Sequence, residues 1–140
     1  MTRPYILFNN NAQEAINFYA EIFGASKQVS TFRDLPPDPR HPAIPEEALD
    51  RVLHGSIKFK DNEIMFCDNP FPKDDRFKPS GFVTIALDFD TVDETKAVYD
   101  KLTVGGDIHH PLESTFFADA YSWFTDKLGV SWQLICGMKM

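Results

Sequence analysis

One pattern of apolar and helix-capping residues occurs twice in this chain, at a constant spacing of 80 residues. In each copy a short apolar run precedes a capping residue, a Glu three positions later and apolar positions on one helical face. The pattern predicts helices over residues 12–23 and 92–103. Two unrelated amphipathic helices are the alternative, but the shared capping register favours a repeated unit. The matched pairs are Leu7 with Leu87, Asn11 with Thr91, Glu14 with Glu94, Tyr19 with Tyr99 and Ile22 with Leu102.

Each predicted helix is followed by three shorter segments with strand character. Each half therefore contains a strand, a helix and three more strands, which predicts an α+β fold. We expect a single domain, residues 1–140, made of two modules at residues 1–68 and 81–140. The predicted later strands are residues 28–32, 52–60 and 63–67 in the first half, and residues 107–110, 121–125 and 130–136 in the second half.

Two proline-containing segments interrupt this order. Residues 34–50 carry five prolines, which fix backbone angles and lack a donor for strand pairing. A loop of this length is either a lid or contact arm, or a disordered insertion, and both alternatives stay open. Residues 69–80 are polar, carry three prolines and form the expected linker between the modules.

Composition excludes several classes of partner. The 140 residues include 14 basic and 21 acidic side chains, a net charge of −7, which disfavours nucleic acid because phosphate backbones require a clustered basic surface. No apolar run approaches the roughly 20 residues that a membrane span needs. The first residues also lack the pattern of a signal peptide, so a cytoplasmic protein is expected. The two cysteines, Cys67 and Cys136, have no CxxC spacing and are expected as free thiols.

Four stretches of the sequence resemble the PhnB-like branch of the vicinal oxygen chelate superfamily, which includes glyoxalase I, bleomycin-binding proteins and extradiol dioxygenases. They are PYILF at 4–8, AINFYAEIFG at 15–24, RVLHG at 51–55 and TDKLGVSWQL at 125–134. The resemblance implies tandem βαβββ modules forming a curved mixed sheet with a cleft, the glyoxalase/bleomycin resistance/dioxygenase fold. The branch is sometimes labelled as a methyltransferase-like domain, yet the chain has no glycine-rich nucleotide loop after a strand.

Metal-dependent members of the superfamily use four inward side chains, mostly His and Glu, on the first and last strands of each module. The resemblance matches these positions here to Pro4 or Tyr5, Met65, Thr84 and Gln133, with one residue of uncertainty at Met65. These side chains are poor ligands for a divalent transition metal. Neither a bound metal nor another cofactor is therefore expected.

The same positions predict a ligand-binding site of a different kind. Aromatic and thioether groups would form its walls, and a hydroxyl and a neutral amide would orient the ligand. Gln133 should face the cleft, because Trp132 and Leu134 then take the opposite side of the strand. The residues predicted to bind ligand are His54, Met65, Thr84, Trp123 and Gln133.

The histidines give no clear catalytic pattern. His54 is either a general base in the cleft or a half-buried strand histidine with a backbone partner. His109 and His110 are adjacent, so in a regular strand they would point to opposite faces and could not both line one site.

We therefore expect a homodimer that binds a small organic molecule in a metal-free cleft. Whether it also catalyses a reaction on that molecule stays open. One alternative is a divalent-metal-dependent lyase, isomerase or dioxygenase with differently placed ligands. Another is an antibiotic-sequestering resistance protein that uses an aromatic-lined cleft at a dimer interface.

Overall fold

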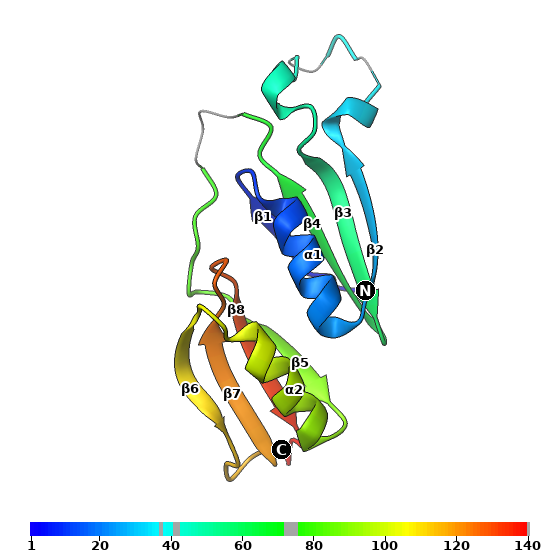
Figure 1. The fold of residues 1–140 in the computed structure, drawn as a ribbon. Coiled ribbons are helices and arrows are strands. Elements are labelled where there is room, and N and C mark those ends of the chain that lie inside the picture. Colours follow the sequence, from blue (N-terminus) through cyan, green and yellow to red (C-terminus); the bar gives the residue numbers. More distant parts are fainter. Residues whose placement is uncertain (37, 41–42, 72–75, 140) are drawn as a thin grey trace. The chain divides into compact units, whose positions relative to one another are not determined.

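The computed structural model describes residues 1–36, 38–40, 43–71 and 76–139. The chain divides into two compact units, Met1–Lys78 and Pro79–Met140. In each unit a strand and a helix are followed by three strands, so the predicted tandem βαβββ fold is confirmed (Figure 1). The strands form two four-stranded mixed sheets, one in each unit. The expected linker, residues 69–80, falls partly on residues 72–75, which lie outside the described residues.

The first unit has its strands in the order β1-β4-β3-β2. The first strand runs parallel to the last strand of the unit, and the other neighbours are antiparallel. The elements are β1 (Tyr5–Phe8), α1 (Ala12–Phe23), β2 (Ser26–Thr31), β3 (Val52–Phe59) and β4 (Asn62–Asp68).

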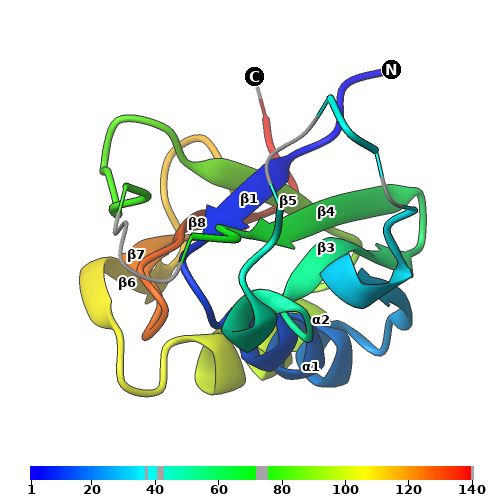
Figure 2. The same cartoon turned by 90° about the horizontal axis from the view of Figure 1, so that it is seen from above.

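The second unit repeats this topology with the strand order β5-β8-β7-β6. Again the first strand is parallel to the last one, and the other pairs are antiparallel. The elements are β5 (Ile85–Phe89), α2 (Val92–Leu102), β6 (Asp107–Glu113), β7 (Ala120–Thr125) and β8 (Ser131–Cys136). Each helix lies on one side of its own sheet (Figures 1 and 2).

The core of each unit lies between the helix and the sheet. In the first unit the Tyr19 ring stacks on Phe66 with 5.9 Å between centroids, and Phe66 stacks on Phe8. In the second unit Tyr99 of α2 meets the buried Phe124 edge-on at 6.0 Å. These buried rings remove large apolar areas from water, which is the main favourable term in folding.

The ends of α1 differ partly from the sequence prediction. Gly24 ends the helix in the left-handed region at φ 63°. Asn11, however, makes no side-chain capping bond, so that part of the prediction is wrong. The Ala12 N–H instead donates to Asp68 Oδ1 at 2.9 Å, and the Val52 N–H donates to Asp68 Oδ2 at 3.0 Å. A carboxylate from β4 therefore replaces the local cap.

The second helix follows the capping prediction at its start. The Thr91 hydroxyl accepts from the Glu94 N–H at 3.1 Å, which satisfies a backbone donor that has no partner within the helix. Val92, at the first position of α2, is 47% exposed. Val98 takes part in the buried face of α2 instead.

The constant spacing of 80 residues is wrong for the first strands. Phe8 and Leu87 both face the helix and are 7% and 6% exposed, whereas Leu7 is 44% exposed. The strands therefore match at a spacing of 79 residues, because one more residue separates Leu87 from α2 than separates Phe8 from α1. In this register Tyr5 corresponds to Thr84.

The proline-rich residues 34–50 leave and rejoin the sheet at neighbouring points. The Phe32 N–H donates to the Arg51 carbonyl at 3.1 Å, and the Arg33 N–H donates to the Leu49 carbonyl at 2.8 Å. Short 3-10 turns at Phe32–Asp34 and Glu46–Ala48 flank the segment. Residues 37, 41 and 42 lie outside the described part of the chain. The role of this loop as a lid or contact arm stays a prediction.

Candidate functional site

Each sheet has one face that its own helix does not cover, and we call these the first and second open faces. Alternate residues along each strand belong to them, because successive strand side chains point to opposite sides. The neighbouring strand residues on the other side, such as Phe66 and Trp132, are fully buried against the helices. The first open face comprises Tyr5, Leu7, His54, Ser56, Lys58, Glu63, Met65 and Cys67, and the second comprises Thr84, Ala86, Asp88, Tyr121, Trp123, Thr125, Ser131, Gln133 and Ile135.

His54 and Met65 of the predicted site lie on the first open face. His54 Nδ1 is 3.1 Å from the Tyr5 hydroxyl, within hydrogen-bonding distance, and the two rings meet edge-on at 5.7 Å. Met65 is the ladder partner of Tyr5 on one side and of Ser56 on the other. Phenol, imidazole and thioether groups are thus gathered on neighbouring strands.

Cys67 is a residue of this face that the sequence analysis did not assign to the site. Phe8 and Leu87 are equivalent, and their strand partners are Asp68 and Leu134. The residues before these partners are Cys67 and Gln133, so Cys67, not Met65, is the equivalent of Gln133 in the first unit. Burial raises the pKa of the Cys67 thiol, the nearby Asp68 charge adds to this, and a hydrogen bond with Tyr5 opposes it. Cys67 lies two residues beyond Met65, outside the one-residue uncertainty of the sequence prediction, so nothing in the sequence marked this position.

Thr84, Trp123 and Gln133 of the predicted site lie on the second open face. Trp123 Nε1 donates to Ser131 Oγ at 3.2 Å, and Ser131 Oγ donates to Thr84 Oγ1 at 2.9 Å. The Tyr121 hydroxyl donates to Gln133 Oε1 at 2.8 Å. Burial raises the pKa of Tyr121, so its hydroxyl keeps the proton that it donates. These bonds fix the polar groups beside the half-exposed indole.

His109 and His110 both lie against this face, so the prediction that they must diverge is wrong. The pairing of β6 with β7 shifts between Ile108 and His110, which inserts an extra residue and breaks the alternation. The His109 ring lies 4.7 Å from the Trp123 ring, and the His110 ring lies 5.1 Å from the Tyr121 ring. A bulge of this kind has no distinct signal in the sequence.

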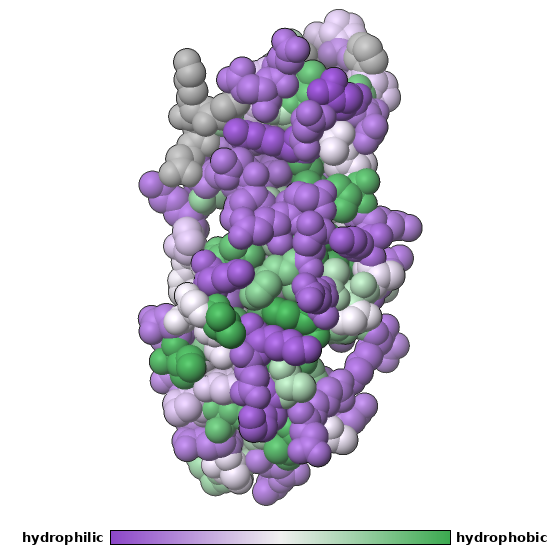
Figure 3. Space-filling view, viewed as in Figure 1, coloured by the Kyte–Doolittle hydropathy of each residue, from purple (hydrophilic) through white to green (hydrophobic). Residues whose placement is uncertain are grey.

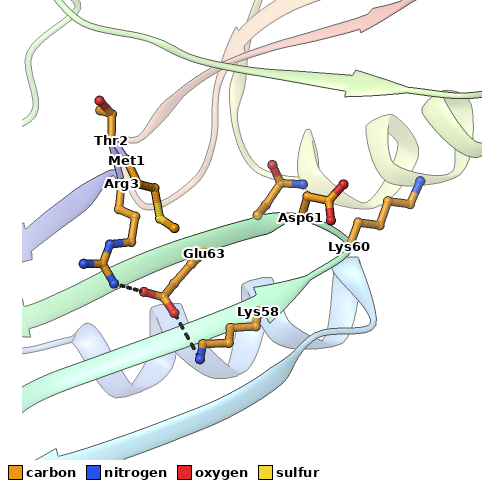
Figure 4. Close-up of a pocket in the computed structure, with 8 residues that line it drawn as sticks. Met1, Thr2, Arg3, Lys58, Lys60, Asp61 and Glu63 are labelled. Carbon is orange, nitrogen blue, oxygen red and sulfur yellow. Dashed lines mark hydrogen bonds and ion pairs between the residues drawn. The ribbon is translucent and has the colours of Figure 1, made fainter.

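Two surface cavities lie apart from the predicted residues. One, of about 490 Å³, is at the β3–β4 hairpin, where Arg3 and Lys58 reach Glu63 from two sides (Figure 4). The single carboxylate of Glu63 is shared between these two cations, and the hydrogen bond from the Arg3 guanidinium holds the pKa of Glu63 below its ordinary value. The other, of about 290 Å³, lies between α2 and the end of β6. The surface drawn in Figure 3 is mostly hydrophilic, with scattered apolar groups.

The superfamily's metal positions do not fit a metal in this chain. In the corrected register they are Tyr5, Cys67, Thr84 and Gln133, and only Cys67 has a side chain that commonly binds transition metals, with burial holding its proton in place. Among the residues that the structure describes, no group of three or more His, Cys, Asp or Glu side chains is arranged to hold an ion. These four positions therefore do not form a donor set for a divalent metal.

A family model described as 3-demethylubiquinone-9 3-methyltransferase matches residues 1–135. The chain belongs to this PhnB-like family. A crystal structure of protein PA1353 from Pseudomonas aeruginosa superposes on the PhnB-like chain with a TM-score of 0.84 and 28% identity, covering 98% of this chain and 97% of that one. A PhnB protein from Bacillus cereus gives a TM-score of 0.76 and 26% identity, with 97% and 98% covered.

A curated relative of this PhnB-like chain is Protein YjdN of Escherichia coli (strain K12). It is 29% identical over 140 residues, which cover 94% of this chain and 91% of YjdN. A glyoxylase/bleomycin resistance protein/dioxygenase domain from Frankia sp. EAN1pec, at 12% identity and a TM-score of 0.67, shares the fold. The expected fold family is therefore confirmed. Within the described residues, neither helix has the length and apolar content needed to cross a bilayer.

Proposed function

We propose that this PhnB-like protein binds a small organic molecule on its open sheet faces without a metal. The observation that carries the proposal is the hydrogen bond from Tyr121 to Gln133 Oε1. Because Tyr121 occupies the carbonyl oxygen, the amide N–H groups of Gln133 are left to donate to an acceptor on a ligand. The ligand therefore carries a carbonyl, ether or hydroxyl oxygen, or a ring nitrogen.

Trp123 supplies most of the apolar contact in this proposal. Trp123 is 38% exposed, and its indole N–H already donates to Ser131. The face of the indole ring is therefore the surface available for stacking on a ligand. Thr84 ends the hydroxyl chain from Ser131 and offers a further polar contact. Pockets that combine aromatic walls with a few oriented polar groups are typical of small-molecule sites.

His54 and Met65 are proposed to contact ligand on the first open face, independently of the contacts on the second. Met65 is an adaptable apolar group, and the bond between Tyr5 and His54 offers a path for proton movement. We do not propose methyl transfer, which the family name describes, because the chain has no glycine-rich nucleotide loop after a strand. Binding alone is the function that these contacts support.

A thermal-shift screen of small organic molecules, followed by titration, tests the proposal. A hit should quench Trp123 fluorescence, and Gln133→Leu should weaken its binding by about 1–3 kcal/mol because an acceptor is left unpaired. Gln13→Leu is the matched control, since it makes the same change at an exposed position of α1, which lies on neither open face. Equal affinity of the wild-type and Gln133→Leu proteins would show that Gln133 is not part of the site. Fluorescence quenching that is retained in Trp123→Phe would show that the ligand does not bind on the second open face.

We propose in addition that the protein is a cytoplasmic homodimer. Each sheet ends in two edge strands, β1 and β2 in one unit and β5 and β6 in the other. Unpaired strand edges are commonly covered by association between chains. Light scattering at micromolar concentration should give twice the 16.0 kDa monomer mass. A monomer mass under these conditions would contradict the proposal.

A further inference from the structure

The second sheet carries negative charge without any balancing Lys or Arg. Strands β5, β6, β7 and β8 contain Asp88, Asp107 and Glu113 but no lysine or arginine. The lysines of this unit lie elsewhere, at Lys96 and Lys101 in α2, at Lys127 in the turn after β7 and at Lys139 near the C-terminus. An anionic ligand on this sheet would therefore meet like charges and no fixed cation.

Glu113 is the carboxylate best placed to act on a ligand at this face. It is the ladder partner of Tyr121 and is mostly exposed. Its Oε1 lies 3.4 Å from His110 Nε2. The Nδ1–H of His110 donates to the Pro111 carbonyl at 2.9 Å. Among the described residues, no Lys or Arg forms an ion pair with Glu113.

The aromatic surface beside Glu113 extends over neighbouring strands. Trp123 lies against His109, and Tyr121 lies against His110 on one side and against Phe117, at 5.0 Å, on the other. The faces of indole and phenol rings carry negative electrostatic potential, which attracts cations. The aromatic ring faces and the Glu113 carboxylate therefore both favour a positively charged ligand.

From these observations we propose that the second open face selects planar aromatic molecules that carry a positive charge. The ring of the ligand stacks on Trp123, and its charge lies toward Glu113. This inference rests on the proposed small-molecule function and adds the ligand class. Gln133 contributes little to the charge preference, since its amide is neutral.

Three bicyclic probes of similar size test the charge preference: 1-methylquinolinium, quinoline and 2-naphthoate. Calorimetric titration at about pH 8, where ordinary imidazole and quinoline are neutral, and at about 0.15 M salt limits the effects of histidine charge and of distant charges. We expect 1-methylquinolinium to bind about tenfold or more tightly than 2-naphthoate, with quinoline between them. The indole N–H resonance of Trp123 should shift, while that of the buried Trp132 should stay in place.

Two substitutions separate a local effect from the net charge of the chain. Glu113→Gln should weaken 1-methylquinolinium binding severalfold and leave quinoline binding unchanged. Asp93→Asn removes the same charge from α2, on the other side of the sheet, and should change neither. Binding of 2-naphthoate as tight as that of 1-methylquinolinium, or an unchanged affinity in Glu113→Gln, would overturn the inference.

The failure of this inference can be distinguished from the failure of the proposed function. If 2-naphthoate binds as tightly as 1-methylquinolinium, shifts the Trp123 indole and is weakened by Gln133→Leu, the binding function stands and the cation preference is wrong. If none of the three probes, nor any molecule in the thermal-shift screen, shifts the Trp123 resonance, both are wrong.

Discussion

Tyr121 donates its hydroxyl proton to Gln133 Oε1 at 2.8 Å, from the strand next to the one that carries Gln133. This bond sets which end of the amide is available to a ligand. Tyr121→Phe should keep the aromatic ring and its contact with Phe117 but free the amide to rotate. Ligand affinity should fall by about 0.5–1.5 kcal/mol, less than in Gln133→Leu. Titration of both variants measures this order, and a larger loss in Tyr121→Phe would contradict the assigned role.

Asp68 is expected to be a structural carboxylate of the first unit. Its two oxygens accept from the N–H groups of Ala12 and Val52, so Asp68→Asn turns one acceptor into a donor that faces an N–H. We expect a loss of about 1–3 kcal/mol in the free energy of unfolding, measured by urea denaturation. Asp61→Asn, at the exposed hairpin turn, is the control and should change little. Equal stability of the two variants would show that these bonds contribute nothing.

The same carboxyl predicts a pH dependence. Burial raises the pKa of Asp68, against the opposing effect of its two backbone hydrogen bonds. Its protonated form is thus favoured on folding, so its contribution to stability is present below the unfolded pKa of about 3.9 and is lost as pH rises through the folded value. Relative to Asp68→Asn, the wild type should lose stability as pH rises over this window. A difference that grew with pH would contradict the raised pKa.

Cys67 should react slowly with alkylating reagents at neutral pH. Burial raises its thiol pKa, and the hydrogen bond with Tyr5 partly offsets this effect. In a Cys136→Ser background, iodoacetamide should modify Cys67 more slowly than it modifies glutathione. Tyr5→Phe keeps the ring but removes the hydroxyl, so the rate should fall severalfold further. A faster reaction in Tyr5→Phe would show that steric access, rather than the hydrogen bond, limits the rate.

A side chain at Gly55 is expected to lower stability. A Cβ at this position would collide with Cδ1 of Ile16 on α1, so Gly55→Ala should cost about 1–3 kcal/mol of stability. Ile16→Val removes that methyl group and should recover part of the loss in the double variant, which a double-mutant cycle measures. Gly81→Ala, where a Cβ meets nothing within 4 Å, is the control. Additive effects of the two core substitutions would contradict the collision.

Elemental analysis should find far less than one transition-metal ion per chain. The four superfamily positions offer a phenol, a protonated thiol, a hydroxyl and an amide, which do not make a donor set for zinc, nickel or manganese. Adding these ions should leave the melting temperature nearly unchanged, since a ligand that binds the native state would raise it. One chelator-removable ion per chain, with lower stability after its removal, would contradict this expectation.

The sequence by itself determined the order of elements and most of their limits. The apolar periodicity placed α1 at its observed residues and α2 within one residue, because both helices bury one regular face. The turn residues likewise separated the later strands. The resemblance carried by residues such as Trp132 and Gln133 identified the fold family. These features are local, or depend on alternation along one element, and are therefore visible in a single chain.

Tertiary structure alone decided which side chains meet. The Asp68 carboxylate binds the start of α1 although it is 56 residues away in the sequence. The residues around Asn11 give no sign of this bond, so the sequence predicted a local cap instead. The place of Cys67 depends on strand register, which moves the matched position two residues along the same face of β4, from Met65 to Cys67. His109 and His110 share a face because a bulge changes the alternation in β6. Pairing between strands is a long-range property, and for that reason the composition of each open face was decided only in the folded chain.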